Sequence, residues 1–126
     1  MDEARERRLL IVDDELQVRK MLETYFTEAG YRVATAEDVQ AAIAKLPEGF
    51  DAVLTDIKMP GASGIDFLQQ ARRSNPKLGV FLITGHATLE TVIDAKQYGA
   101  VAYFRKPLNL TEVDSRLRAF LGEDAR

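Results

Sequence analysis

The hydrophobic positions of this chain form short apolar runs that alternate with longer segments of helical periodicity. Five runs are rich in β-branched or aromatic residues and have the length of strands, at 9–12, 32–35, 50–55, 80–83 and 101–104. After each run, apolar residues recur every three to four positions, which is typical of an amphipathic helix. The repeated strand–helix order predicts a doubly wound α/β domain, in which a parallel sheet has helices on both faces.

Turn-forming and capping residues set the expected ends of the helices. Gly30 is a natural stop for the first helix, and Asp14 with Gln17 three residues later resembles a capping box at its start. Later helices are expected at 37–46, at 63–74 and from about Thr88 to Tyr98, and the last helix is expected to bury Leu110, Val113, Leu117, Phe120 and Leu121. We expect the fourth helix to be the most loosely held, because its apolar stripe is limited to Leu89, Val92 and Ile93.

Length and composition indicate one globular domain. The chain has 126 residues, of which 46% are hydrophobic, and this share is enough for a hydrophobic core and excludes disorder. We expect the domain at 9–121, between a charged lead at 1–8 and a short tail at 122–126. No apolar run approaches the length of a membrane span and the charged start does not resemble a signal peptide, so a cytoplasmic protein is expected.

Charge and residue usage exclude several kinds of ligand. The net charge of −3 provides no general attraction to nucleic acid or to an anionic membrane, so neither is expected as a direct partner. Cysteine is absent and there is one histidine, which excludes disulfides, thiolate metal sites and histidine-rich metal sites.

Polar residues stand where four of the five expected strands end. Asp13 and Asp14 follow the first strand, Asp56 the third, Thr84 the fourth and Lys106 the fifth. Taken singly, each has an ordinary explanation, such as a helix cap, a turn former, a loop hydroxyl or a surface lysine. In an open parallel sheet, however, ligands bind at the carboxyl ends of the strands, where the strand order reverses. These side chains are therefore expected to form one site.

Three carboxylates in one site require positive charge nearby. At about 5 Å and an effective dielectric constant near 20, each pair repels by roughly 3 kcal/mol. Lys106 supplies one positive charge, and the lack of histidine and cysteine ligands favours Mg²⁺ or Mn²⁺ as the source of the rest. With the repulsion offset, Asp56 can act as a carboxylate nucleophile and carry an acyl phosphate, while Lys106 and Thr84 hold phosphoryl oxygens.

Four short motifs occur in order along the chain. They are Ile11-Val12-Asp13-Asp14-Glu15, Thr55-Asp56-Ile57-Lys58-Met59-Pro60-Gly61 with Gly64, Thr84-Gly85-His86, and Lys106-Pro107. Each is weak alone, but the set at these spacings is specific. On these motifs the chain, from about 9 to 121, resembles the receiver domains of two-component response regulators. The resemblance implies a flavodoxin-like fold with five helices and a five-stranded sheet in the order 2-1-3-4-5.

The resemblance implies a role for each acidic residue. Asp56 would be the phosphoacceptor. Asp14, Asp56 and the backbone carbonyl of Lys58 would bind Mg²⁺ directly, and Asp13 would hold a metal-bound water.

The resemblance also implies roles for the other polar residues. Thr84 and Lys106 would bind the phosphoryl group, and the Lys106–Pro107 peptide bond would be cis. Tyr103 matches the aromatic residue that changes rotamer on activation, so Thr84 and Tyr103 would form the switch. Lys58 and His86 occupy positions at which side chains of this family tune the loss of the phosphate.

By the same resemblance, the domain would be a signalling switch and not an enzyme acting on a separate substrate. It would take its phosphoryl group from a histidine kinase or a histidine phosphotransfer protein. The surface of the fourth helix, fifth strand and fifth helix would then bind a downstream protein, a fused effector domain or a second copy of the chain. The motifs around Asp56 and Thr84 are similar to those of receivers fused to transcription activators.

Two other classes of protein fit parts of the pattern. A Mg²⁺-dependent phosphatase or phosphotransferase with an aspartate nucleophile would have a second acid two residues later, where this chain has Lys58. A nucleotide- or flavin-binding domain of the same topology would have a glycine-rich loop that opens a helix, and Gly61 and Gly64 do not form one. The phosphorylation switch is therefore favoured.

Overall fold

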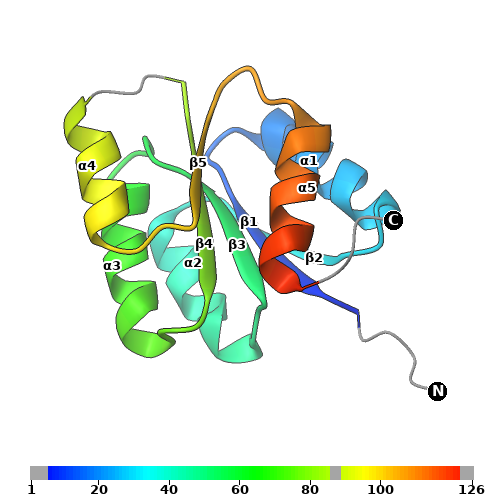
Figure 1. Cartoon of the computed structure of the whole chain (residues 1–126), viewed down its shortest axis with the longest axis horizontal. Coiled ribbons are helices and arrows are strands. Elements are labelled where there is room, and N and C mark those ends of the chain that lie inside the picture. The colour runs from blue at the N-terminus through cyan, green and yellow to red at the C-terminus, as the bar shows by residue number, and fades with distance from the viewer. Residues whose placement is uncertain (1–5, 86–88, 123–126) are drawn as a thin grey trace.

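The computed structural model describes residues 6–85 and 89–122, which alternate between strands and helices as predicted (Figure 1). The elements are β1 (Arg8–Val12), α1 (Leu16–Glu28), β2 (Arg32–Ala36), α2 (Val39–Lys45), the 3₁₀ turn η1 (Leu46–Glu48), β3 (Ala52–Asp56), α3 (Gly64–Ser74), β4 (Gly79–Thr84), α4 (Leu89–Gln97), β5 (Ala102–Arg105) and α5 (Leu110–Leu121). Because α2 already ends at Lys45, Pro47 lies in the 3₁₀ turn and is not the residue that stops the helix.

The strands form one sheet in the order β2-β1-β3-β4-β5, and every neighbouring pair is parallel. This confirms the predicted doubly wound fold and its strand order. The chain leaves β1 in one direction to build β2 and returns to the other side of β1 to build β3. The strand order therefore reverses at the carboxyl ends of β1 and β3, where sheets of this kind bind ligands.

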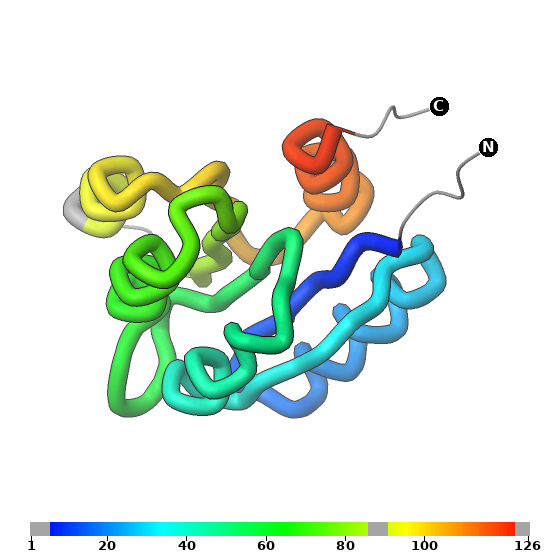
Figure 2. Tube along the Cα trace, turned by 90° about the horizontal axis from the view of Figure 1, so that it is seen from below, coloured from blue at the N-terminus to red at the C-terminus, as the bar shows by residue number. Residues whose placement is uncertain are grey.

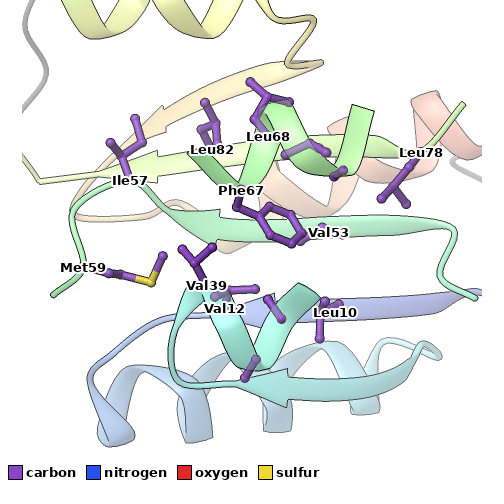
Figure 3. Packing of buried hydrophobic residues seen from close by; sticks show 14 of the residues in the cluster. Leu10, Val12, Val39, Val53, Ile57, Met59, Phe67, Leu68, Leu78 and Leu82 are labelled. Atoms are coloured by element: carbon purple, nitrogen blue, oxygen red, sulfur yellow. The ribbon is translucent and has the colours of Figure 1, made fainter. Parts of the chain in front are cut away.

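Two hydrophobic layers cover the sheet, one on each face. Leu10, Val53 and Leu82 pack with α2 and α3 on one face, as Figure 3 shows, whereas Leu9 and Leu54 pack with α1 and α5 on the other. Figure 2 shows the same division of the helices around the sheet. Successive residues of a strand point to opposite faces, so a strand buried on both sides must be apolar throughout. This explains why these strands read as continuous apolar runs.

The amino ends of α1 and α3 are built differently. Ser63 and Asp66 form a capping box at the start of α3, in which each side chain bonds the backbone of the other residue. The capping box predicted for α1 is wrong. The helix begins after Glu15, which makes no side-chain cap within the described residues, and Asp14 is exposed. Because Glu15 is the N-cap, the third helical position is Val18 and not Gln17, so the spacing of the predicted box is one residue out of register. The Glu15 amide donates instead to the carboxylate of Asp13 at 2.8 Å.

The apolar residues of α4 are more exposed than predicted. Val92 is 40% exposed and Ile93 52% exposed, whereas Ala95 is buried. Thr88 and the side chain of Leu89 lie outside the part of the chain that the structure describes. In α5, Val113 and Leu117 are buried as predicted, but Leu110 and Leu121 are half-buried and Phe120 is 39% exposed. Because α4 buries so little apolar surface, it is expected to open readily. The looseness of α4 stays a prediction, which this exposure supports.

The carboxyl end of α4 is tied to its neighbours by one polar side chain. The guanidinium of Arg72, at the end of α3, donates to the carbonyl oxygens of Pro76 (2.9 Å) and Leu78 (2.8 Å). It also donates to Gly99, in the turn that follows α4 (3.0 Å). This side chain therefore joins three separate segments at the end of the molecule opposite the polar strand ends.

Candidate functional site

The residues predicted to form the site meet at the carboxyl edge of the sheet. In the pairing of β1 with β3, Val12 lies opposite Thr55, so that Asp13 and Asp56 follow in adjacent positions. The Nζ atom of Lys106, after β5, lies 3.0 Å from Oδ2 of Asp56 and 3.7 Å from Oδ2 of Asp13. Asp56 and Lys106, together with Asp14, Glu15 and Thr84, line an open cleft of about 540 Å³ at that edge.

Three carboxylates form the acidic part of the cleft. One oxygen from each of Asp13, Asp14 and Asp56 lies within 4.8 Å of the other two. Asp13 is fully buried and Asp56 is 5% exposed, whereas Asp14 is exposed. A fourth acid, Glu15, lies 3.8 Å from the Lys106 ammonium, although the sequence motif alone assigns it no role. The Lys106 ammonium thus lies within 3.8 Å of three acidic side chains, those of Asp13, Glu15 and Asp56.

Burial makes the negative charge of Asp13 unfavourable. Desolvation is the main cause, and with repulsion from Asp56 and Asp14 it raises the pKa of Asp13 to about 6. The hydrogen bond from the Glu15 amide and the charge of Lys106 act against this shift but do not cancel it. The folded protein therefore holds Asp13 ionised at neutral pH at a cost in free energy, which a bound cation would relieve.

Lys106 is held in its charged form by the same acids. Burial lowers its pKa, but the hydrogen bond to Asp56 and the negative charges of Asp56, Asp13 and Glu15 outweigh burial, and the net pKa is raised. The backbone amide of Lys106 also donates to the carbonyl oxygen of Thr84 at 2.8 Å, which aligns the ends of β4 and β5. The Lys106–Pro107 peptide bond is cis, as predicted.

The carboxylate of Asp56 is oriented by a contact at each oxygen. Oδ2 accepts from Lys106, and Oδ1 accepts from the backbone amide of Lys58 at 3.1 Å. The loop beneath is fixed by the Ile57 amide, which donates to Ile83 (2.9 Å), and by the Gly64 amide, which donates to Ile57 (2.7 Å). Gly64 packs so closely on the Asp56 carbonyl that no side chain fits there. The sequence motif includes Gly64, but the motif alone does not indicate that this residue packs against the Asp56 carbonyl.

The donor set fits a hard divalent cation. Oδ2 of Asp13 is buried and has no hydrogen-bond partner among the described residues, and the Lys106 ammonium lies 3.7 Å from it. Buried carboxylate oxygens are normally hydrogen-bonded or bound to a metal, so this atom is placed as a ligand-facing group would be. All three acids offer oxygen, which Mg²⁺ prefers. Asp13, Asp14 and Asp56 are therefore the residues that would hold the ion.

The two residues predicted to form the switch lie near α4. Thr84 is 3% exposed at the end of β4 and lines the cleft. Tyr103, on the edge strand β5, is half-buried, and its hydroxyl lies 3.3 Å from Oγ1 of Thr91 in α4. Gly85 lines the cleft without a side chain to narrow it, while His86 lies outside the described residues.

Comparison with known families identifies the class of protein. The family model of the response regulator receiver domain matches residues 9–118, so the chain belongs to this family, as the motifs predicted. It has the phosphorylatable aspartate pocket of these domains, made by Asp13, Asp14 and Asp56, and it acts as a signalling switch. Receiver domains bind Mg²⁺ at this acidic pocket. The alternative of a phosphatase or phosphotransferase is not favoured.

The chain is similar to regulators of different sizes. It is 30% identical over 115 residues to sporulation initiation phosphotransferase F of Bacillus subtilis (strain 168), covering 90% of this chain and 93% of that protein. It is 37% identical over 106 residues to the DNA-binding transcriptional regulator NtrC of Klebsiella pneumoniae, covering 81% of this chain but 22% of that protein. Several other curated relatives are likewise matched over about a quarter of their length.

Among solved structures, the response regulator protein TrrA from Thermotoga maritima in complex with Mg²⁺-BeF superposes with a TM-score of 0.82 at 30% identity. The match covers 90% of this chain and 98% of that chain.

None of the helices within the described residues is long and apolar enough to cross a membrane.

Proposed function

We propose that Asp56 receives a phosphoryl group from the phosphohistidine of a histidine kinase or a histidine phosphotransfer protein. A carboxylate oxygen of Asp56 bonds to phosphorus while the bond from phosphorus to the imidazole nitrogen breaks, and the leaving imidazole takes a proton from solvent. The position of the Asp56 carboxylate carries this proposal. It lines the cleft at the end of β3, lies 3.0 Å from a lysine ammonium and belongs to a cluster of three acids.

The surrounding residues would stabilise the phosphoryl group as it arrives. Lys106, which bonds Asp56 Oδ2, would transfer its contact to a phosphoryl oxygen, and the Thr84 hydroxyl would donate to another. Asp14, Asp56 and the backbone carbonyl of Lys58 would hold Mg²⁺ or Mn²⁺, with Asp13 acting through a water. The bound ion supplies the positive charge that lets an anionic group approach these carboxylates.

Intact mass spectrometry tests the acceptor. After incubation with acetyl phosphate and Mg²⁺, the wild-type protein is expected to gain the mass of one phosphoryl group, and the Asp56→Asn variant to gain none. Asp51→Asn is a matched control, because it removes a carboxylate just before the amino end of β3, at the opposite edge of the sheet. A phosphate adduct that persists in Asp56→Asn would show that another residue is the acceptor, and the assignment would then be abandoned.

We propose further that phosphorylation is read through α4, β5 and α5. Val92, Ile93 and Tyr98 leave apolar surface exposed on and just after α4, and the Tyr103–Thr91 contact joins this helix to β5. If the Thr84 hydroxyl turns to a phosphoryl group, Tyr103 can change its position against α4, which provides the two arrangements that a switch requires. The surface would then meet a downstream protein, a fused effector domain or a second copy of the chain.

A double-mutant cycle tests this coupling. Thr84→Ala, Tyr103→Phe and the double variant are compared by hydrogen exchange of α4 with and without Mg²⁺ and beryllofluoride, a phosphoryl mimic. Coupled residues are expected to give losses of the response that are not additive, because both act on one arrangement. Additive losses would show that Thr84 and Tyr103 act independently, and a full response in Tyr103→Phe would exclude Tyr103 from the switch.

Three further expectations remain proposals. We infer that the independently folded unit spans 9–121, that it works in the cytoplasm, and that any direct contact with nucleic acid or membrane is made by other parts of a regulator. The family match at residues 9–118 and the short aligned share of the longer relatives support the first. Limited proteolysis is expected to leave a core with these ends, and cleavage inside the sheet would contradict it.

A further inference from the structure

Hydrogen bonds to its backbone and within itself hold the acidic loop between β1 and α1. The amide of Asp13 donates to Ala36 at the end of β2 (3.2 Å), and the amide of Glu15 donates to the carboxylate of Asp13 (2.8 Å). A further bond comes from a side chain of α1: Nη1 of Arg19 donates to the backbone carbonyl oxygen of Asp13 at 2.8 Å. Arg19 therefore connects the first turn of α1 to the loop that precedes the helix.

The geometry of Arg19 suits a positioning role. Its backbone amide bonds the carbonyl of Glu15 (3.0 Å), so the residue lies one turn into α1 and its guanidinium reaches back over that turn. The side chain is half-buried, which shelters the hydrogen bond from water. The carbonyl that it holds belongs to Asp13, whose carboxylate is completely buried and which precedes Asp14 in the sequence. A shift of this carbonyl would move both acids.

We propose that Arg19 is a positioning residue for the divalent-cation site, holding the backbone at Asp13 so that the carboxylates of Asp13 and Asp14 point at one ion. This inference rests on the proposed function, in which these acids bind Mg²⁺. Groups that orient metal ligands from behind typically change metal affinity by about 10- to 100-fold when they are removed. The motifs of the sequence do not include Arg19, because its contact is with a main-chain atom.

The direction in which the Mg²⁺ affinity changes when Arg19 is removed distinguishes a positioning role from a purely electrostatic one. Arg19 carries a positive charge near a site for a cation, so by electrostatics alone its removal would tighten the binding of Mg²⁺. If it positions the loop, its removal must weaken binding instead. The neighbouring Lys20 is an exposed cation on the same turn of α1, and Lys20→Gln therefore measures the effect of charge without the hydrogen bond.

Titration calorimetry with Mg²⁺ alone, at low ionic strength and pH 8, tests the proposal on the intact chain. Arg19→Gln is expected to raise the Kd for Mg²⁺ by about tenfold. Lys20→Gln is expected to leave it unchanged or slightly lower, and Arg19→Lys, which keeps a donor of similar reach, is expected to recover most of the affinity. An Arg19→Gln protein that binds Mg²⁺ as well as or better than wild type would overturn the proposal.

Hydrogen exchange of the metal-free protein in EDTA supplies a second readout. The Glu15 amide and the first turn of α1 are expected to exchange faster in Arg19→Gln than in Lys20→Gln; equal exchange would also overturn the proposal. If wild type bound no Mg²⁺, the proposed metal site would fail while this comparison still decided whether Arg19 holds the loop. Should Arg19→Gln fail to fold, Arg19→Met, which keeps the apolar stem, takes its place in both measurements.

Discussion

Replacement of Gly64 by alanine is expected to lower the free energy of unfolding by about 3 kcal/mol and to misplace Asp56. A Cβ atom at position 64 would lie 2.9 Å from Cα of Ile57 and 3.1 Å from the carbonyl carbon of Asp56, and still closer to the carbonyl oxygen of that residue. All of these are backbone atoms. They cannot move freely, because the Ile57 amide is bonded to β4 and the Gly64 amide to the Ile57 carbonyl. Either the start of α3 or the end of β3 must shift.

Gly79→Ala is the matched control for this prediction. A Cβ atom at that position would also be too close to a neighbour, 2.6 Å from Cζ of Phe120, but the neighbour is a side chain that is 39% exposed. The ring can turn toward solvent at the loss of its edge-to-face contact with Phe81, which costs about 1 kcal/mol. Urea denaturation and the rate of phosphorylation by acetyl phosphate measure both effects. Equal stability losses in the two variants would contradict the backbone explanation.

Asp13→Asn is expected to stabilise the metal-free protein at pH 7 by about 3 kcal/mol, because the buried carboxylate is ionised there at a cost. Asp13 has a pKa of about 6 in the folded protein against 3.8 as the ordinary value. Between these values the folded state holds a proton that the unfolded state has released, so wild-type stability falls as pH rises from about 4 to 6 and stays low above that. The asparagine variant lacks this fall, and its Oδ1 can still accept from the Glu15 amide.

In excess Mg²⁺, the wild-type protein is expected to become more stable than Asp13→Asn, the reverse of the order expected without metal. The ion binds the folded wild type and stabilises it by mass action, whereas Asp13→Asn has lost part of the site. Chemical denaturation between pH 4 and 8, in EDTA and in excess Mg²⁺, measures the effect. Asp14→Asn is the control from an exposed position of the same cluster, and its gain in EDTA is expected to be smaller. A metal-free Asp13→Asn protein less stable than wild type at pH 7 would show that Asp13 is favourably paired.

The architecture and the composition of the site could be predicted from the sequence, because both follow from local patterns. A run such as 80–83 is apolar at successive positions only if both faces of its strand are covered, and this implies helices on each side of a parallel sheet. Parallel strands end at one edge, so the polar residues that follow them, Asp13, Asp56 and Lys106, must converge. Neither conclusion needs a specific long-range contact.

Other features depend on contacts that only the folded chain makes. The sequence treats Asp13 and Asp14 alike, but the turn into α1 buries Asp13 and exposes Asp14. Desolvation is the main reason that the pKa of Asp13 is raised to about 6. The predicted capping box is absent because α1 begins one residue later than the Asp14–Gln17 spacing requires.

Exposure and main-chain contacts were also decided by tertiary structure. The exposure of Val92 and Ile93 in α4 could not be predicted, because helical periodicity does not say how closely a helix approaches its sheet. The hydrogen bond from Arg19 to the Asp13 carbonyl depends on the path of the backbone. Residue types alone do not predict such a contact with a main-chain atom. The sequence by itself thus determined the fold and the groups that meet at its active edge. Burial and backbone geometry decided that ionisation is unfavourable at Asp13, that Arg19 bonds the backbone of this residue, and that apolar side chains of α4 stay exposed.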